Sequence, residues 1–152
     1  MTRIRISLQA AAAFVLIHLT VAAAVPAKDV EITAGDNMRF NLSTITAAPG
    51  QTLHVILTNM GTLPKDVMGH NWILLGMDQD PEAYSKAALA AKADNYEPKS
   101  LASHVLAVIP LLGPRKSGEV TFTAPTKPGK YPYLCSFPAH FAAGMRGVLV
   151  VQ

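Results

Sequence analysis

One cysteine, two histidines and a methionine in this sequence have the types and spacing of a metal site. Cys135, His140 and Met145 lie in one short segment, with four residues between each neighbouring pair. A second histidine, His70, lies far upstream and directly follows Gly69. Two imidazoles, one thiolate and a weak thioether suit copper in both of its oxidation states. We therefore predict a type-1 copper site, in which Met145 is the long axial ligand.

Other roles for these side chains have less support. Structural zinc usually takes more than one cysteine, and catalytic zinc needs an open position with a general base nearby. No carboxylate lies close in sequence to Cys135 or His140, and no Asn or Asp beside His140 could orient a Cys-His catalytic pair. Taken singly, each residue could be a packing or surface residue, but their conjunction favours a metal. We interpret His54 and His104 as strand residues that face solvent or pack, not as ligands.

Short alternating runs separated by turn residues predict the elements that hold this site. Pro49-Gly50, for example, is a strong turn signal. The segment 52–58 places Leu53, Val55 and Leu57 on one face and His54 on the other. The pattern predicts an all-β fold, a Greek-key β-sandwich of about eight strands with one helical insertion. The strand-like runs are 30–33, 38–42, 45–48, 52–58, 70–75, 103–109, 119–123, 131–134 and 147–151.

The helical insertion is expected over Pro81 to Ala93. Asp80 can cap it, Pro81 suits the first helical position, and alanine dominates the segment. Tyr84, Ala88 and Ala91 are expected to face the body of the protein. After the helix, residues 95–99 are expected to return the chain to strands, and 110–118 to form a loop.

The first 27 residues have the pattern of a secretory signal peptide. A basic start with Arg3 and Arg5 precedes an apolar stretch from Leu8 to Ala24 and a small-residue exit. Cleavage is expected after Ala27, or alternatively after Ala24; an uncleaved membrane anchor is the rival interpretation.

We therefore predict one domain, residues 28–152, in the periplasm, without stable membrane association once the signal is removed. Loss of two arginines lowers the formal charge from +3 to +1. With no basic patch containing interleaved aromatics, nucleic acid is not an expected partner.

Three stretches resemble the azurins, within the cupredoxin family. They are 37–41 (Asn-Met-Arg-Phe-Asn), 63–72 (Leu-Pro-Lys-Asp-Val-Met-Gly-His-Asn-Trp) and 135–140 (Cys-Ser-Phe-Pro-Ala-His). The resemblance implies ligation by His70, Cys135, His140 and Met145, with the carbonyl of Gly69 approaching from the opposite side. It also implies that Asn71 ties its own loop to the region of Cys135 and Ser136.

The sequence departs from azurins in four places. The spacing from His140 to Met145 is one residue longer and is similar to that of the auracyanins. There is no second cysteine to form the azurin disulfide. Asn59 stands at the position of the azurin histidine that titrates with pH, and the run around Val108 lacks the azurin surface histidine.

The resemblance implies one-electron transfer without bond chemistry. The implied partners are c-type cytochromes or copper oxidoreductases, which would dock around an exposed His140 on an apolar surface with few charges. That surface would comprise Leu63, Pro64, Met68, Pro138, Ala139, Phe141 and Ala142. A periplasmic copper carrier or buffer, and a binding module that has lost its metal, are the alternatives.

Overall fold

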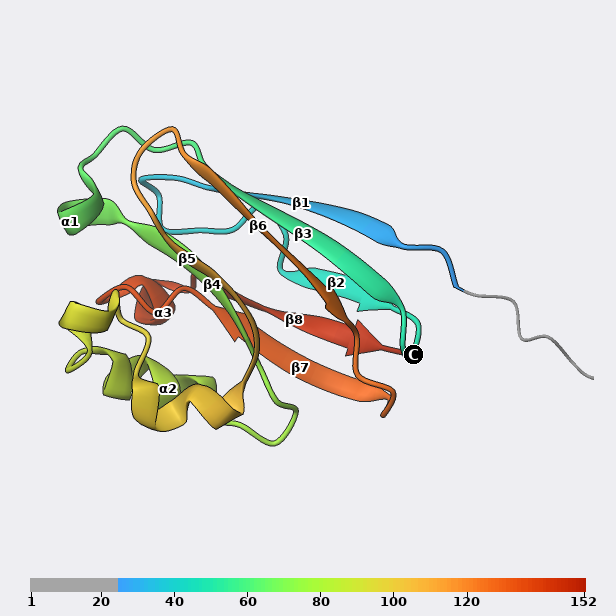
Figure 1. The fold of residues 1–152 in the computed structure, drawn as a ribbon. Coiled ribbons are helices and arrows are strands. Elements are labelled where there is room, and N and C mark those ends of the chain that lie inside the picture. Colours follow the sequence, from blue (N-terminus) through green and yellow to red (C-terminus); the bar gives the residue numbers. More distant parts are fainter. Residues whose placement is uncertain (1–24) are drawn as a thin grey trace, which may run out of the picture.

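The computed structural model describes residues 25–152, which form a two-layer β-sandwich (Figure 1). One sheet has three strands in the order β1-β3-β6, and the other has five in the order β2-β8-β7-β4-β5. This arrangement confirms the predicted all-β sandwich. The strands are β1 (Lys28–Ala34), β2 (Thr44–Ala47), β3 (Thr52–Asn59), β4 (His70–Leu75), β5 (Val105–Leu112), β6 (Ser117–Thr123), β7 (Gly129–Leu134) and β8 (Arg146–Val151).

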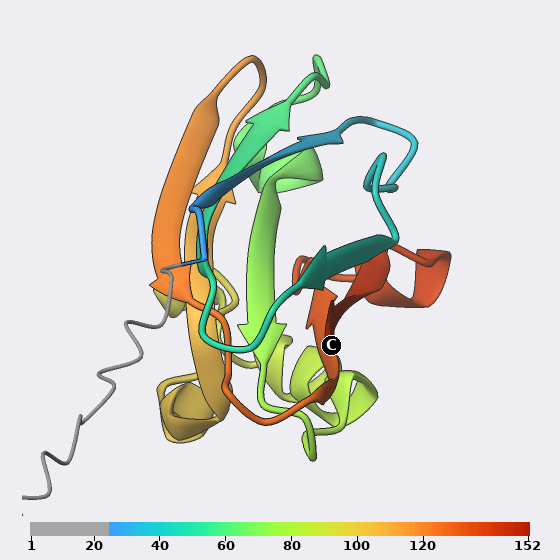
Figure 2. The same ribbon diagram turned by 90° about the vertical axis from the view of Figure 1, so that its right-hand side faces the viewer.

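The core lies between the two sheets, as the end-on view in Figure 2 shows. In β3 the alternation is complete, and Leu53, Val55 and Leu57 are fully buried. Trp72 of β4 and Leu149 of β8 face them from the five-stranded sheet. Burial of alternate residues from both sheets fixes the register, because a slip by one residue would turn every apolar side chain to the other face.

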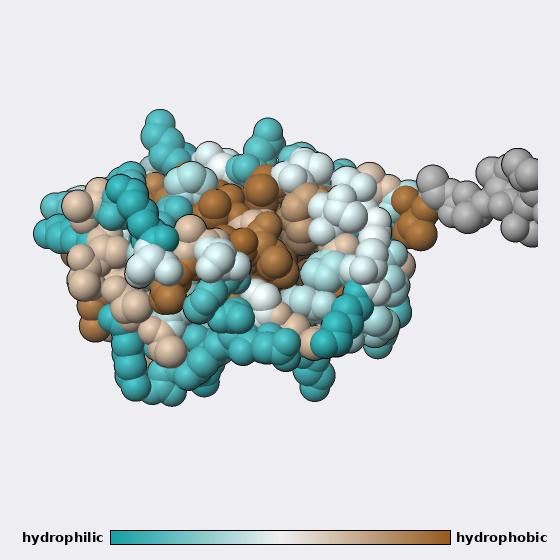
Figure 3. All heavy atoms as spheres, turned by 60° about the horizontal axis from the view of Figure 1, so that its bottom comes forward, coloured by the Kyte–Doolittle hydropathy of each residue, from teal (hydrophilic) through white to brown (hydrophobic). Residues whose placement is uncertain are grey.

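The helix α2 (Pro81–Ala88) covers part of the outer face of the five-stranded sheet. The Asp80 carboxylate accepts a hydrogen bond from Glu82 N at 2.8 Å, so the predicted cap is confirmed. Tyr84 and Ala88 are buried as predicted, whereas Ala91 is half-buried and outside the helix. Figure 3 views the molecule from this side and shows apolar side chains gathered in the middle, bordered by hydrophilic ones.

Four predictions about connecting segments are wrong. The helix stops at Ala88 instead of Ala93, and a 3-10 helix, η1 (Lys92–Asp94), follows it. No strand forms over 95–99, and a second 3-10 helix, η2 (Lys99–His104), leads to β5. Run 38–42 makes only an isolated bridge between Ala34 and Phe40, because Met38 has a left-handed φ of 54° that breaks the extended chain.

The predicted loop 110–118 begins as a strand. β5 extends through Pro110 to Leu112, and it can do so because β5 lies at the edge of its sheet. At an edge, the missing N–H of a proline leaves no ladder bond unmade.

Four loops gather at one end of the sandwich, which we call the metal end. They are 35–43, 60–69, 113–116 and 135–145, and they include the short helices α1 (Lys65–Met68) and α3 (His140–Ala143) at the left of Figure 1. No helix within residues 25–152 is long and apolar enough to cross a membrane. The predicted signal lies, apart from its last three residues, outside the described residues, so its removal stays a prediction.

Candidate metal centre

His70 is the first residue of β4 and is placed by the tight turn before it. α1 begins after Pro64 and ends at Gly69, whose extended backbone leads directly into the strand. A Cβ on Gly69 would lie 2.6 Å from Lys65 O and 2.9 Å from Leu111 Cγ, so only glycine fits there without a shift. The close packing of this glycine holds the start of β4, and with it the His70 ring, against β5.

The other candidate ligands come from the loop between β7 and β8. Cys135 directly follows β7, and Met145 directly precedes β8. Cys135 N donates to Met145 O at 3.1 Å, and Met145 N donates to His140 O at 2.9 Å. These bonds close the loop so that Cys135, His140 and Met145 lie together. Ala139, where azurins usually have glycine, has the left-handed φ of 69° that favours glycine.

The structure brings His70, Cys135 and His140 into one buried group. One ligand atom from each residue, a ring nitrogen or the sulfur, lies within 4.8 Å of the other two. Cys135 Sγ and His140 Nδ1 are 3.4 Å apart, and the two imidazole centroids are 4.9 Å apart. β4 makes this possible by pairing with β7, with Ile73 opposite Leu134.

The state of these side chains fits a metal. Both ring nitrogens of His70 are buried without a hydrogen-bond partner among the described residues, which is costly for polar atoms unless something else binds them. Burial, with a smaller contribution from His70, lowers the pKa of His140 to about 4, and burial also lowers the pKa of His70. Both imidazoles are therefore neutral at pH 7, the form in which histidine binds metals.

The thiol of Cys135 is also suited to a metal rather than to exposed reactivity. Burial raises its pKa to about 12, so without a metal it is a thiol. A bound metal replaces that proton. One thiolate with two imidazoles is a donor set that copper prefers.

The whole described chain has the sequence of a copper protein. Residues 26–152 match the family model described as copper binding proteins of the plastocyanin/azurin family. The chain belongs to this family. It is 35% identical to the azurin of Pseudomonas chlororaphis over 126 residues, 81% of this chain and 97% of that one. It is 33% identical to auracyanin-B of Chloroflexus aurantiacus over 128 residues, 83% of this chain and 53% of that one.

Solved structures agree with this assignment. Auracyanin A of Chloroflexus aurantiacus, titled a "blue" copper protein, has a TM-score of 0.73 and 33% identity, with 84% of this chain and all of that one covered. The reduced auracyanin of Roseiflexus castenholzii has a TM-score of 0.72 and 32% identity, with 82% and 96% covered. The predicted cupredoxin family, fold and copper cofactor are confirmed.

Asn71 connects the two halves of the cupredoxin site as predicted. Its Nδ2 donates to Ser136 Oγ at 2.8 Å, and its Oδ1 accepts from Ser136 N at 2.8 Å. Ser136 Oγ in turn donates to Tyr96 O at 2.6 Å, so the segment after η1 is joined to the same loop. Sequence reasoning missed Tyr96, because a carbonyl acceptor leaves no trace in residue type.

Phe137 is a further neighbour of the site that the sequence reasoning did not single out. Its ring centroid lies 4.8 Å from that of His140 and 5.0 Å from that of Tyr96. Its place inside the ligand loop was the available clue.

His140 itself is 2% exposed, so it lies just beneath the surface, and the expectation of an exposed His140 is wrong. Phe141 is also buried, packed in a second apolar cluster with Ile73.

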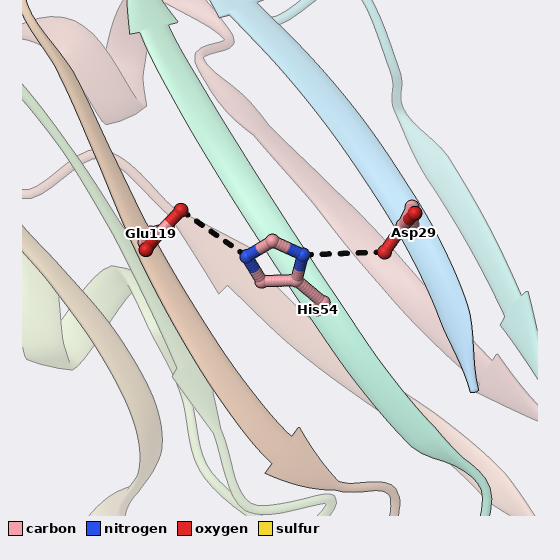
Figure 4. Close-up of polar contacts among 3 residues, drawn as sticks. All are labelled: Asp29, His54 and Glu119. Carbon is pink, nitrogen blue, oxygen red and sulfur yellow. Dashed lines mark hydrogen bonds and ion pairs between the residues drawn. The ribbon is translucent and has the colours of Figure 1, made fainter.

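The other two histidines among residues 25–152 lie away from the site. His54 of β3 faces outward between Asp29 of β1 and Glu119 of β6, at 3.2 Å from each carboxylate (Figure 4). His104 ends η2 and is not in a strand. Met145 is fully buried and bonded through its main chain to both neighbouring ligands; its axial role, and that of the Gly69 carbonyl, stay predictions.

Proposed function

We propose that this protein is a one-electron carrier with a single blue-copper centre and that it catalyses no bond chemistry. The observation that carries the proposal is the pair of unbonded, buried nitrogens of His70 beside Cys135 and His140. A buried polar atom without a partner is uncommon and needs an explanation, and a metal held by one of these nitrogens supplies one. A catalytic metal site would be expected to have a general base nearby. Among the described residues, no carboxylate belongs to this group.

The residues divide the binding between them. His70 and His140 would hold the metal through nitrogen and Cys135 through its thiolate, and Met145 Sδ and the Gly69 carbonyl would be the weaker donors. Copper supplies the single-electron change between its two oxidation states.

The protein frame keeps the ligands in one geometry. His70 starts a strand whose side chains are all buried, and hydrogen bonds between Asn71 and Ser136 join that strand to the Cys135 loop. Ligands that hardly move on oxidation or reduction keep the barrier to electron transfer low. His70, Cys135 and His140 are all buried, and this burial excludes water from the site.

The partners we propose are c-type cytochromes or copper oxidoreductases of the periplasm. Residues 1–27 direct the export that brings this protein to them. Among the described residues, the large exposed apolar side chains of the metal end are Met60, Leu63 and Val67, which are 54%, 39% and 55% exposed. Exposed apolar groups near a redox centre suit the small, transient interfaces of electron transfer.

An absorption spectrum of purified 28–152 with one equivalent of Cu(II) tests the proposal, together with Cys135→Ser and a control, His54→Gln. We expect an intense blue charge-transfer band in the wild type and the control, and none in Cys135→Ser. Cyclic voltammetry should then show a reversible one-electron wave.

A colourless wild type, or bands that survive in Cys135→Ser, would contradict the copper–thiolate site. A blue protein that gives up Cu(I) within seconds to a chelator would instead support the copper carrier or buffer.

A further inference from the structure

Charge is distributed unevenly along this sandwich. Outside the four loops of the metal end and Arg146 beside them, the described chain has six basic and eight acidic residues. The metal end has the opposite balance. Its five basic residues are Arg39, Lys65, Arg115, Lys116 and Arg146, and its two acidic residues are Asp36 and Asp66, all of them exposed.

Two of these cations flank α3, the helix that begins with His140. The Arg146 guanidinium lies 4.8 Å from the centroid of the Phe141 ring. The Arg39 guanidinium lies against Gly144 on the other end of the helix, where an added Cβ would be 3.2 Å from Arg39 Cζ. Two cations therefore lie beside the helix that begins with His140.

Other elements at this end do not neutralise the cations. Lys65 and Lys92 line a hollow of about 250 Å³ beside Phe137, with Asp66 as its one acidic lining residue. Asp94, from the neighbouring 3-10 helix, pairs with Lys99.

The ion pairs among the described residues include none of the five cations. They join His54 to Asp29 and Glu119, Lys86 to Glu82 and Lys99 to Asp94. The Asp36 carboxylate accepts instead from Thr62 N and Oγ. The positive charge of the metal end is therefore available to an external anion.

We propose that the metal end docks a redox protein through an acidic ring on that protein, with Arg39 and Arg146 as the principal contacts. Exposed apolar surface alone does not identify the metal end as the docking surface, because Figure 3 shows apolar surface in the middle of another side of the molecule. At the metal end, Lys65 lies between the exposed Leu63 and Val67 in the chain, and Arg39 lines the same hollow as the exposed Met60. An apolar centre with a charged rim gives a partner both contact and orientation. The inference rests on the proposed function, since it concerns the electron-transfer partner of the same site.

A redox-inert anion tests the surface independently of electron transfer. We would titrate ¹⁵N-labelled, copper-free 28–152 with hexacyanochromate(III), whose paramagnetism broadens nearby amide signals. We expect broadening to concentrate at the amides of residues 38–40 and 144–147 and to weaken as salt is added. Equal broadening at Lys127 and Lys130, at the opposite end, would overturn the proposal.

Rates provide the second test. Copper-loaded, reduced protein gives one electron to hexacyanoferrate(III), which becomes hexacyanoferrate(II), or to the cation tris(phenanthroline)cobalt(III), which becomes the cobalt(II) complex. The variant Arg39→Glu/Arg146→Glu is compared with Lys127→Glu/Lys130→Glu, which changes net charge equally.

At low salt, we expect the rate with the anion to fall about tenfold in the arginine variant and the rate with the cation to rise, with little change in the lysine variant. Equal effects in both variants would overturn the docking site. A wild type that is blue but exchanges no electron with either reagent would contradict the proposed function, while the titration still decides the surface.

Discussion

Asn71→Ala should lower the free energy of unfolding more than a substitution of any exposed residue, because it breaks the connection between β4 and the ligand loop. The asparagine is fully buried and makes two hydrogen bonds with Ser136, each 2.8 Å long. Each bond contributes about 1 kcal/mol, and leaving the buried Ser136 N–H without an acceptor costs about 1 kcal/mol more. We expect the free energy of unfolding to fall by about 3 kcal/mol.

A double-mutant cycle separates this network from simple loss of volume. Ser136→Ala removes the Asn71 Nδ2 bond and the bond to Tyr96 O, but keeps the bond from Ser136 N to Asn71 Oδ1. The two substitutions share one bond, so the double variant should lose about 1 kcal/mol less than the sum of the singles.

Urea unfolding of the copper-free protein measures these differences without a contribution from metal affinity. A loss below about 1 kcal/mol in Asn71→Ala, or strict additivity in the double variant, would refute the reasoning, since typical uncoupled pairs add within about 0.5 kcal/mol.

Two further predictions concern sites outside this network. The hydrogen bond that protonated His54 donates to Asp29, and next the one that it donates to Glu119, raises the pKa of His54 above 6.5. The stability that protonated His54 contributes is thus fully present below pH 6.5 and is lost as pH rises through the raised pKa. Unfolding curves at pH 5.5 and 8.5 should show a larger loss for His54→Gln at the lower pH; an equal loss at both would contradict this. Gly144→Ala should lower the free energy of unfolding by about 1–2 kcal/mol, because the φ of 101° at Gly144 disfavours a side chain. Gly35→Ala should be nearly neutral by the same assay, because the nearest atom to the added Cβ, Asn37 Oδ1, is in ordinary contact at 3.8 Å.

Local patterns in the sequence were sufficient for most of the strands and for the nature of the site. Alternation along 52–58 predicts which face of β3 is buried, because a strand turns successive side chains to opposite sides. The same local chemistry identifies the α2 cap at Asp80. Cys135, His140 and Met145 are close in the chain, so any tight loop between two strands brings them together.

The segment after α2 could not be derived in this way. Its 3-10 helices depend on contacts with distant parts of the chain, such as the bond from Ser136 Oγ to Tyr96 O. Tyr96 and Asn95 both have left-handed φ values, 64° and 54°, which no local propensity predicts for a tyrosine.

Residue types and spacing thus determined the donor set, the family and most strands of this protein. The tertiary structure decided what depends on pairing between distant strands: that β4 lies beside β7 and brings His70 to Cys135, although they lie 65 positions apart in the chain. It also decided that Arg39 and Arg146 flank the helix of His140. Sequence alone cannot fix these positions, because the free energy that sets them comes from burying the two sheets against each other, and that burial involves the whole chain at once.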